Sequence, residues 1–268
     1  MRLILYLCES LQVFRARPAR RDISESQAAR GRATTLLTVM VFQAVGKLLG
    51  YRKQGKSLKD RTRERRGAAD EERLCLDPQF TSARITDADI LMLVALPKGV
   101  NADEWLASNV LGFYNHVSLL YGCISEFCTS SSCPTMKAWS SQFQWMDERG
   151  RKKRCSAPQY ADYAVSLSQK LLSSEELFPT REQKDFSRHF RPAMQRILRL
   201  LFHLLVHIYS SHFRAVLALE LHPHLNTLYL HLLLFCAEFR LLECGEMAAS
   251  EELTTALLKA GRQCSSAS

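Results

Sequence analysis

Apolar side chains recur every three or four residues through much of the chain beyond residue 100, and this spacing predicts helices with one buried face. The first predicted helix begins at Asn101, because Asn101 and Glu104 form an N-x-x-E pair whose side chains can satisfy backbone N–H groups of the first turn. A second helix is predicted over 160–172. A long third helix opens at Pro192, where a missing N–H costs nothing.

A last helix is predicted over 227–242, capped by Asn226. It is apolar on most sides, so we expect it to be central. Residues 143–154 instead alternate apolar and polar side chains around a turn at 147–150, which predicts a β-hairpin. The sequence therefore predicts a mainly α fold, a helical bundle with one small β-hairpin.

The charge pattern divides the chain. Residues 1–80 hold 17 Lys and Arg against 9 Asp and Glu, so they carry nearly all of the net charge of +9. We expect a basic, largely disordered N-terminal extension over 1–75, a helical domain over 76–248 and a C-terminal tail over 249–268. The extension either keeps the protein soluble or contacts anionic lipid or nucleic acid.

Composition narrows the class of protein. The 268 residues are 47% hydrophobic and 24% charged, as in ordinary globular proteins. No uncharged apolar run reaches the roughly 18–20 residues of a membrane-spanning helix. The apolar run in residues 1–8 is too short for a signal peptide, so we expect an intracellular protein of the cytoplasm and nucleus. The nine cysteines are then expected to be reduced, and either buried or metal-bound.

Two residue pairs have spacings used by structural zinc sites. Cys128 and Cys133 are spaced C-x4-C, and His207 and His212 are spaced H-x4-H in the long helix. Two thiolates and two imidazoles suit a tetrahedral zinc ion. Cys123 adds an alternative, because it forms an overlapping C-x4-C pair with Cys128. The other interpretation is that these side chains are simply buried and hydrogen-bonded.

The histidine spacing is awkward on a regular helix. Five residues turn about 500°, so the two imidazoles would lie about 140° apart around the axis. If both side chains bind one ion, either one ring reaches around the helix or the helix loosens near Ser210 and Ser211.

The sequence lacks the common enzyme signatures, including G-x-G-x-x-G, the P-loop, G-x-S-x-G and H-E-x-x-H. We therefore do not expect an enzyme. Two long stretches contain no Lys or Arg, one between Lys98 and Lys137 and one between Arg214 and Arg240. Both contain Glu residues among apolar residues, a combination that suits a basic amphipathic helix from a partner.

Several separated motifs resemble the Mob (Mps one binder) family of kinase co-activators. The resemblance covers about residues 75–245. The segments at 107–109, 147–150 and 217–222 are most similar to the subtype that binds NDR kinases. The matching runs are 96–109 (LPKGVNADEWLASN), 121–133 (YGCISEFCTSSSC), 155–163 (CSAPQYADY), 177–180 (LFPT), 207–213 (HIYSSHF) and 224–227 (HLNT).

The resemblance implies a Mob-like fold with one structural zinc ion, held by Cys128, Cys133, His207 and His212. It also implies a non-enzymatic regulatory subunit that binds the basic N-terminal helical region of NDR/LATS-type serine/threonine kinases. The binding face would be acidic and apolar. The matching positions are Glu104, Trp105, His116, Leu119, Leu120, Leu219, Glu220 and His231.

Two departures from the family pattern are visible. Val100 stands where the best-known subtype has an acid that contacts the kinase. That subtype also reads phosphopeptides with a basic cluster, and the matching positions here are Arg199, Leu200 and His203. With one permanent charge left, we expect phosphopeptide docking to be weak or absent. The alternative function is a zinc-containing module that binds nucleic acid through the basic extension.

Overall fold

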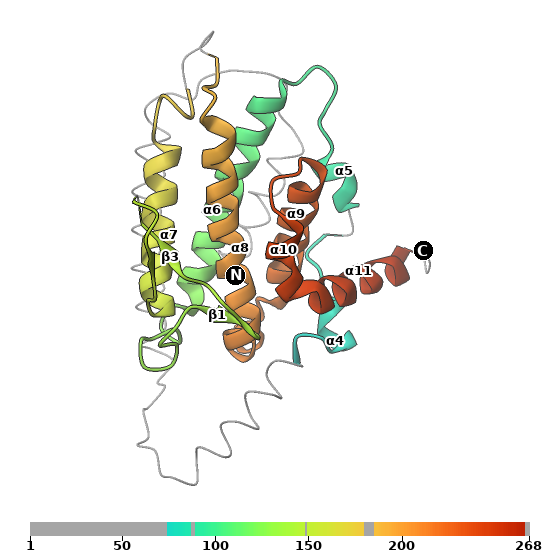
Figure 1. Ribbon diagram of the computed structural model, residues 1–268. Coiled ribbons are helices and arrows are strands. Elements are labelled where there is room, and N and C mark those ends of the chain that lie inside the picture. Colours follow the sequence, from blue (N-terminus) through green and yellow to red (C-terminus); the bar gives the residue numbers. More distant parts are fainter. Residues whose placement is uncertain (1–73, 87–88, 148, 180–184, 266–268) are drawn as a thin grey trace.

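The computed structural model of the chain describes residues 74–86, 89–147, 149–179 and 185–265. These residues form a mainly α-helical bundle, as predicted, in which α8 packs against the other three long helices (Figure 1). The long helices are α6 (Ala102–Ile124), α7 (Ala157–Leu172), α8 (Phe190–Ala218) and α9 (His222–Glu238). The N-terminal extension predicted over 1–75 lies almost entirely outside the described residues.

Helix α8 is the centre of the hydrophobic core. Among the described residues, it is the one helix long and apolar enough to cross a membrane, but 78% of its apolar window is buried inside the fold. That burial is what a core helix of a bundle requires. The apolar positions that recur every three or four residues along it are all buried: Ile197, Leu200, Leu201, Leu204, Leu205 and Ile208.

The start of α6 follows the sequence prediction. The Asn101 side chain accepts hydrogen bonds from the backbone N–H groups of Asp103 and Glu104, at 2.9 and 3.2 Å. These bonds satisfy two of the N–H groups that a helix leaves free at its beginning. Helix α7 begins a few residues before the predicted 160, because Ser156 and Gln159 form a capping box there.

The predicted start of the last helix was wrong. Helix α9 begins at His222, and Asn226 lies inside it, buried. The Asn226 side chain donates to the carbonyls of Phe80 and Ala83 and accepts from the hydroxyl of Tyr209. Asn226 therefore ties the segment before α5 to α8 and α9, and it caps nothing. The helix is central, as predicted.

Two small β-hairpins are present where one was predicted. The predicted hairpin pairs β3 (Trp145–Met146) with β4 (Lys152–Lys153) around the turn at 147–150. The second pairs β1 (Lys137–Ala138) with β2 (Ser141–Gln142), immediately before it. These four two-residue strands lie between α6 and α7 in the chain.

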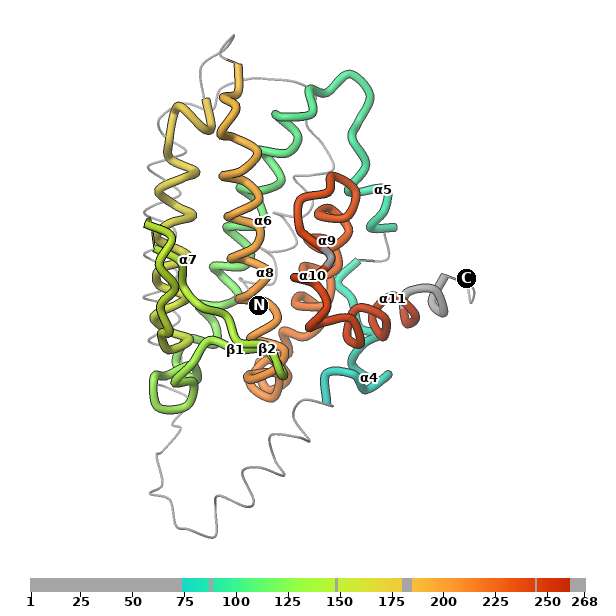
Figure 2. Tube along the Cα trace, in the orientation of Figure 1, coloured from blue at the N-terminus to red at the C-terminus, as the bar shows by residue number. Residues whose placement is uncertain are grey.

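The C-terminal segment, predicted as a tail over 249–268, contains a packed helix. Helix α11 (Glu251–Ser265) lies beside α9 and the short α4 (Pro78–Thr81), as Figure 2 shows. Leu253 and Leu257 are buried in this contact. The helix packs because these two side chains lie four residues apart, on one face of the helix.

Three short elements complete the described fold. Helix α5 (Ile90–Val94) packs on α9, with the Asp89 side chain accepting from the N–H of Leu91 at its start. Helix α10 (Cys244–Met247) and the 3-10 turn η1 (Ala248–Ser250) connect α9 to α11.

Candidate functional site

The two histidines of the H-x4-H pair converge because α8 is broken between them. His212 has φ −136° and ψ 15°, which is not helical. The change in direction compensates for the 140° offset that a regular helix would impose. The imidazole rings of His207 and His212 lie with centroids 5.1 Å apart. The sequence left two alternatives open, and the loosened helix is the correct one, at the residue after Ser211.

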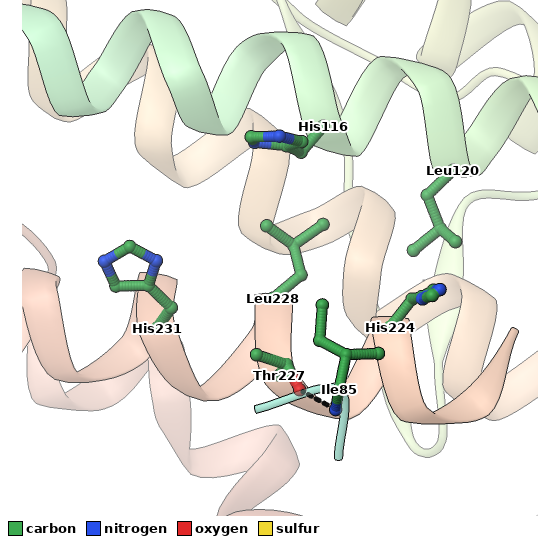
Figure 3. Close-up of a pocket in the computed structure, with 7 residues that line it drawn as sticks. All are labelled: Ile85, His116, Leu120, His224, Thr227, Leu228 and His231. Atoms are coloured by element: carbon green, nitrogen blue, oxygen red, sulfur yellow. Dashed lines mark hydrogen bonds between the residues drawn. The ribbon is translucent and has the colours of Figure 1, made fainter. Parts of the chain in front are cut away.

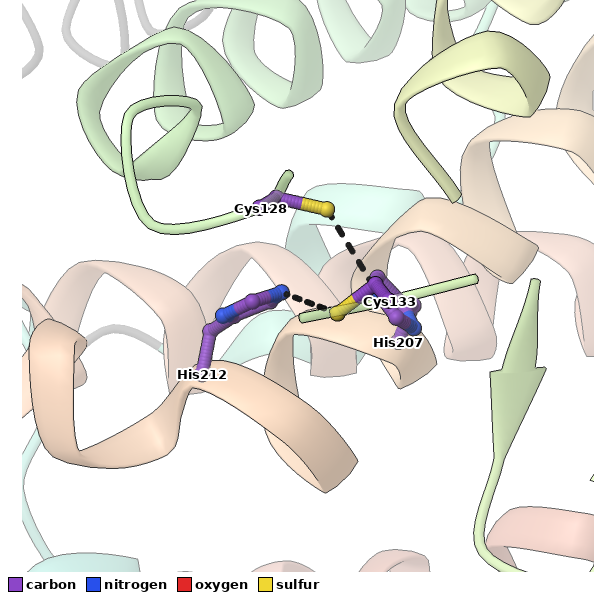
Figure 4. Close-up of side chains that lie close together, drawn as sticks. All are labelled: Cys128, Cys133, His207 and His212. Carbon is purple, nitrogen blue, oxygen red and sulfur yellow. Dashed lines mark hydrogen bonds between the residues drawn. The ribbon is translucent and has the colours of Figure 1, made fainter. Parts of the chain in front are cut away.

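The two cysteines meet the histidines in the interior. Cys128 lies in the loop after α6 and Cys133 follows in the same loop (Figure 4). The Cys128 Sγ lies 3.5 Å from His207 Nε2, and the Cys133 Sγ lies 3.4 Å from His212 Nε2. All four ligand atoms lie within 4.8 Å of one another, and all four residues are buried.

A backbone carbonyl fixes one of the imidazoles. The Nδ1 of His207 lies 2.7 Å from the carbonyl oxygen of Lys137, in β1. Because a carbonyl only accepts, Nδ1 carries the hydrogen, and in the neutral ring Nε2 presents its lone pair to the cysteines. A partner of this kind orients metal-binding histidines in many proteins. The unpredicted β1–β2 hairpin therefore has a role, because it supplies this carbonyl.

The thiols are electrostatically unequal. The hydrogen bond that Cys128 donates to the Cys133 sulfur lowers the pKa of Cys133, and the neighbouring His212 acts in the same direction. Donating that bond, together with burial, raises the pKa of Cys128, while a hydrogen bond from Tyr121 acts in the opposite direction. The cluster thus stabilises a thiolate at Cys133, which is the form that binds metals.

The donor set can hold a metal ion. The two sulfur-to-nitrogen separations of 3.5 and 3.4 Å match the edges of a tetrahedron with metal–ligand bonds of about 2.0–2.3 Å, and all four ligand atoms lie within 4.8 Å of one another. Cys123 is half-buried on α6 and is not part of this group, so the alternative C-x4-C pair is excluded as the ligand pair. A site with four protein ligands leaves no position for a substrate.

The residues expected at the partner-binding face fall into two groups. Glu104 and Glu220 are exposed, and Leu119 and Leu219 are half-buried. Trp105 is half-buried and donates its indole N–H to the carbonyl of Val94, 3.4 Å away, so it links α6 to the end of α5. The remaining three are nearly inaccessible, and the exposed fraction is 9% or less for each: His116, Leu120 and His231.

The three buried members line a small apolar pocket between α6 and α9. Figure 3 shows His116 and Leu120 projecting from α6 toward His231 and His224 on α9. Ile85 closes one side, where its backbone N–H donates to the Thr227 hydroxyl at 3.2 Å. Burial lowers the pKa of His231 to about 4 and also lowers that of His116, so both rings are neutral at pH 7.

The profile of the Mob1/phocein family matches residues 82–250. The chain belongs to this family. It is 47% identical over 203 residues to MOB kinase activator 2 of Homo sapiens, covering 76% of this chain and 85% of that protein.

Other Mob relatives agree. MOB kinase activator 2 of Mus musculus is 46% identical over 203 residues, which are 76% of this chain and 86% of that protein. Maintenance of ploidy protein mob1 of Schizosaccharomyces pombe is 38% identical over 183 residues, which are 67% of this chain and 87% of that protein. The resemblance to the Mob family is thus confirmed over most of the described domain.

The three positions that match the Mob phosphopeptide cluster make contacts within this fold. Arg199 forms an ion pair with Glu246 of α10. His203 is buried, stacks on Phe143 and is hydrogen-bonded to the hydroxyl of Tyr160 at 2.7 Å. Burial lowers the pKa of His203 to about 3, so it is uncharged at pH 7. Leu200 is buried and apolar. The cluster therefore presents one cation, which a carboxylate already neutralises.

Sequence reasoning missed three contributors to these sites. The Lys137 carbonyl carries no signal in the sequence, because any residue has a carbonyl. Tyr121 begins one of the matching runs but was not assigned a role. Ile85 precedes the predicted helices, and only the fold brings it to the pocket.

Proposed function

We propose that this chain is a non-enzymatic regulatory subunit that binds the basic N-terminal helical region of an NDR/LATS-type serine/threonine kinase and changes the activity of that kinase. The carrying observation is membership of the Mob1/phocein family, with relatives named kinase activators at up to 47% identity. The acidic and apolar face on α6 and at the α8–α9 junction supplies a surface of the right chemistry.

The face has the dimensions of a helix-binding surface. Glu104 lies in the first turn of α6, and Leu120 lies 16 residues further along, about 24 Å away. His224 and Leu120 line the same pocket, so Glu220, just before α9, belongs to this second end. A basic helix of about 16 residues would span both carboxylates. Its apolar side would cover Leu119 and Leu219, which are half-buried.

The charge of this face also favours a basic partner segment. No Lys or Arg occurs between Lys98 and Lys137 or between Arg214 and Arg240, although the surface there includes exposed positions. The exposed carboxylates of Glu104 and Glu220 therefore attract a basic segment and repel an acidic one, with no nearby Lys or Arg to offset them. Because His116 and His231 are neutral at pH 7, they add no positive charge that would oppose the partner.

We further propose that Cys128, Cys133, His207 and His212 hold one structural zinc ion. Thiolate and imidazole ligands suit zinc, and the tetrahedral spacing fits it. When bound, the ion would cross-link the loop after α6 to both sides of the break in α8. It would stabilise the bundle rather than take part in a reaction.

We also propose that the protein acts in the cytoplasm and nucleus. The six cysteines whose side chains the structure describes are free thiols, as expected in a reducing compartment. The alternative function, nucleic-acid binding through the basic extension, has no support from the comparisons, whose relatives are named as kinase activators or for ploidy maintenance.

The experiment is a pull-down of NDR-type and LATS-type kinases by the full-length chain, followed by an assay of kinase activity. Wild type is compared with Glu104→Lys/Glu220→Lys and with Glu251→Lys/Glu252→Lys, which reverses two exposed charges on α11. We expect only the first variant to lose binding, with metal content unchanged in both. Equal binding by all three proteins would contradict the proposal, and the activity assay gives the sign of regulation.

A further inference from the structure

A second charged surface lies on the β3–β4 hairpin, away from both sites described above. Residues 147–154 (DERGRKKR) contain five bases and two acids. Figure 1 shows β3 beside α7, on the opposite flank of the bundle from α9 and α5. The positive charge of this hairpin and the base-free face of α6 and α9 therefore point in different directions.

Two of the five bases on this hairpin have partners within the fold, and three have no carboxylate partner among the described residues. Arg151 is paired with Asp147 at 2.9 Å, and Lys153 lies over the ring of Tyr163. Within the part of the chain that the structure describes, no carboxylate pairs with Arg149, Lys152 or Arg154, and all three are exposed.

The hairpin holds these bases in a fixed arrangement. The Asp147 side chain accepts from the N–H groups of Arg149 and Arg151, both at 2.9 Å, which connects the two sides of the turn. Gly150, at φ 76°, allows the tight reversal. Met146 is directly opposite Lys152 in the register, so both side chains lie on one side of the ribbon. Arg154 follows Lys152 with the period of two that keeps it on that side.

An apolar side chain lies in the middle of this charge. Met146 is 49% exposed and lies beside the unpaired cations. The aromatic neighbour Trp145 faces inward instead, where it packs on Tyr160 and Tyr163 with centroids 5.6 and 5.2 Å away. The surface therefore offers one apolar contact among cations and no exposed aromatic ring.

We propose that the β3–β4 hairpin docks on an anionic lipid bilayer, with Met146 entering the headgroup layer between Arg149, Lys152 and Arg154. Bases near an anionic leaflet are attracted to it, and an apolar side chain beside them gains by leaving water. Single-stranded nucleic acid is a poorer fit, because its binding sites stack bases on exposed aromatic rings. With the hairpin on the membrane, the face of α6 and α9 remains open to a kinase.

Three bases give weak binding alone, so the basic N-terminal residues would act as a second anchor. Residues 1–73 hold 17 Lys and Arg. Stable membrane association generally requires two such signals. The full-length chain is therefore the correct material for the test, with comparisons made between variants that share the same N-terminal residues.

The test is sedimentation of the full-length chain with phosphatidylcholine vesicles and with equimolar phosphatidylcholine–phosphatidylserine vesicles. We expect wild type to bind only the anionic vesicles. Lys152→Gln/Arg154→Gln should lower the partition coefficient about 25-fold, roughly fivefold for each base removed. The control Lys98→Gln/Lys259→Gln removes the same charge from exposed positions elsewhere and should lower it less than about threefold.

A second variant tests the apolar contact. Met146→Ser removes the apolar side chain, so it should reduce binding about threefold or more. Because it keeps every charge, the dependence of binding on salt should not change. Circular dichroism and metal content are measured on every variant to show that the fold is retained. An unchanged partition coefficient in Met146→Ser would contradict the insertion of this side chain.

Other results would overturn the proposal. If the hairpin and control double variants bind vesicles equally, the N-terminal residues alone carry the attraction. If the hairpin variant loses affinity for duplex DNA or RNA but keeps its affinity for vesicles, the surface binds nucleic acid. If it self-associates on a sizing column with vesicle binding unchanged, the bases only protect an exposed strand edge.

Discussion

Glu220 occupies a backbone conformation that favours glycine. It lies two residues after the end of α8 and has φ 55°, in the left-handed region that most side chains avoid. The N–H of Glu220 donates to the carbonyl of Leu217, and the N–H of Leu221 donates to the carbonyl of Val216. This pair of bonds is a Schellman motif, and its left-handed position is usually glycine.

Replacing Glu220 with glycine should change the stability of the protein and its affinity for the kinase segment in opposite directions. Glu220→Gly removes a left-handed penalty of about 1–2 kcal/mol, from which the greater flexibility of glycine in the unfolded chain subtracts about 0.5–1 kcal/mol. The net expectation is a gain of about 0.5–1 kcal/mol, or a melting temperature higher by about 1–4 °C. The loss of a charged contact should weaken binding of the basic kinase segment about tenfold.

Arg240 provides a matched control, because it has φ 53° after α9 and the same pair of Schellman bonds. Arg240→Gly should be stabilised equally, without losing affinity for the kinase segment. Glu220→Gln should lose affinity without gaining stability, since it keeps the side-chain size. Stability is measured by thermal unfolding and affinity by fluorescence anisotropy. A Glu220→Gly variant that is more stable and binds normally would refute the role of Glu220 in binding, and a destabilised one would refute the strain argument.

Three further predictions concern stability. Cys133→Ser, or a strong chelator, should lower the melting temperature by many degrees with loss of bound metal, whereas Cys123→Ser should not; equal melting of both variants would exclude a structural ion. Asn226→Ala should cost about 3 kcal/mol in denaturant unfolding, because it removes three buried hydrogen bonds and takes away the partner of the Ala83 carbonyl and of the Tyr209 hydroxyl, and a cost near zero would contradict its role. The pKa of His203 is about 3 in the folded protein, below its value of 6.5 in the unfolded chain. Between these pH values only the unfolded chain binds the proton, so the free energy of unfolding falls as pH falls from 6.5 toward 3. His203→Phe should therefore reduce the slope of unfolding free energy against pH by about 1.4 kcal/mol per unit, and an unchanged slope would exclude His203 as its source.

The sequence predicts the long helices well, because their buried faces repeat over many turns. Helix α6 begins where Asn101 places it, and the buried stripe of α8 follows its leucines and isoleucines. The C-terminal helix and the role of Asn226 were not predicted. Helix α11 was expected to be a tail, although Leu253 and Leu257 follow two first-turn glutamates with helical spacing. Asn226 was mistaken for a cap because its real partners are distant in the sequence.

The metal cluster shows more clearly what the sequence cannot predict. The spacings and the resemblance identified all four residues, and the structure brings those four together. The spacings could not show how two histidines on opposite sides of a helix would meet. The angle between them was worked out for a regular helix, and the backbone departs from helical geometry at His212. The partner face was predicted as a set of contacts, but burial depends on tertiary packing. His116, Leu120 and His231 are therefore in the wall of a pocket rather than on the surface.

The most direct test of the proposed function is the dissociation constant of the full-length chain for a purified NDR-type kinase N-terminal segment, measured by titration calorimetry at low and high salt. Micromolar or tighter binding is expected for wild type, weakening with salt. We expect Glu104→Lys/Glu220→Lys to abolish the binding heat, while Glu251→Lys/Glu252→Lys retains it, with equal metal content in all three proteins. Undiminished binding by the Glu104→Lys/Glu220→Lys protein would contradict the assignment of this face, and absence of binding by metal-loaded wild type to both NDR-type and LATS-type segments would contradict the proposed function itself.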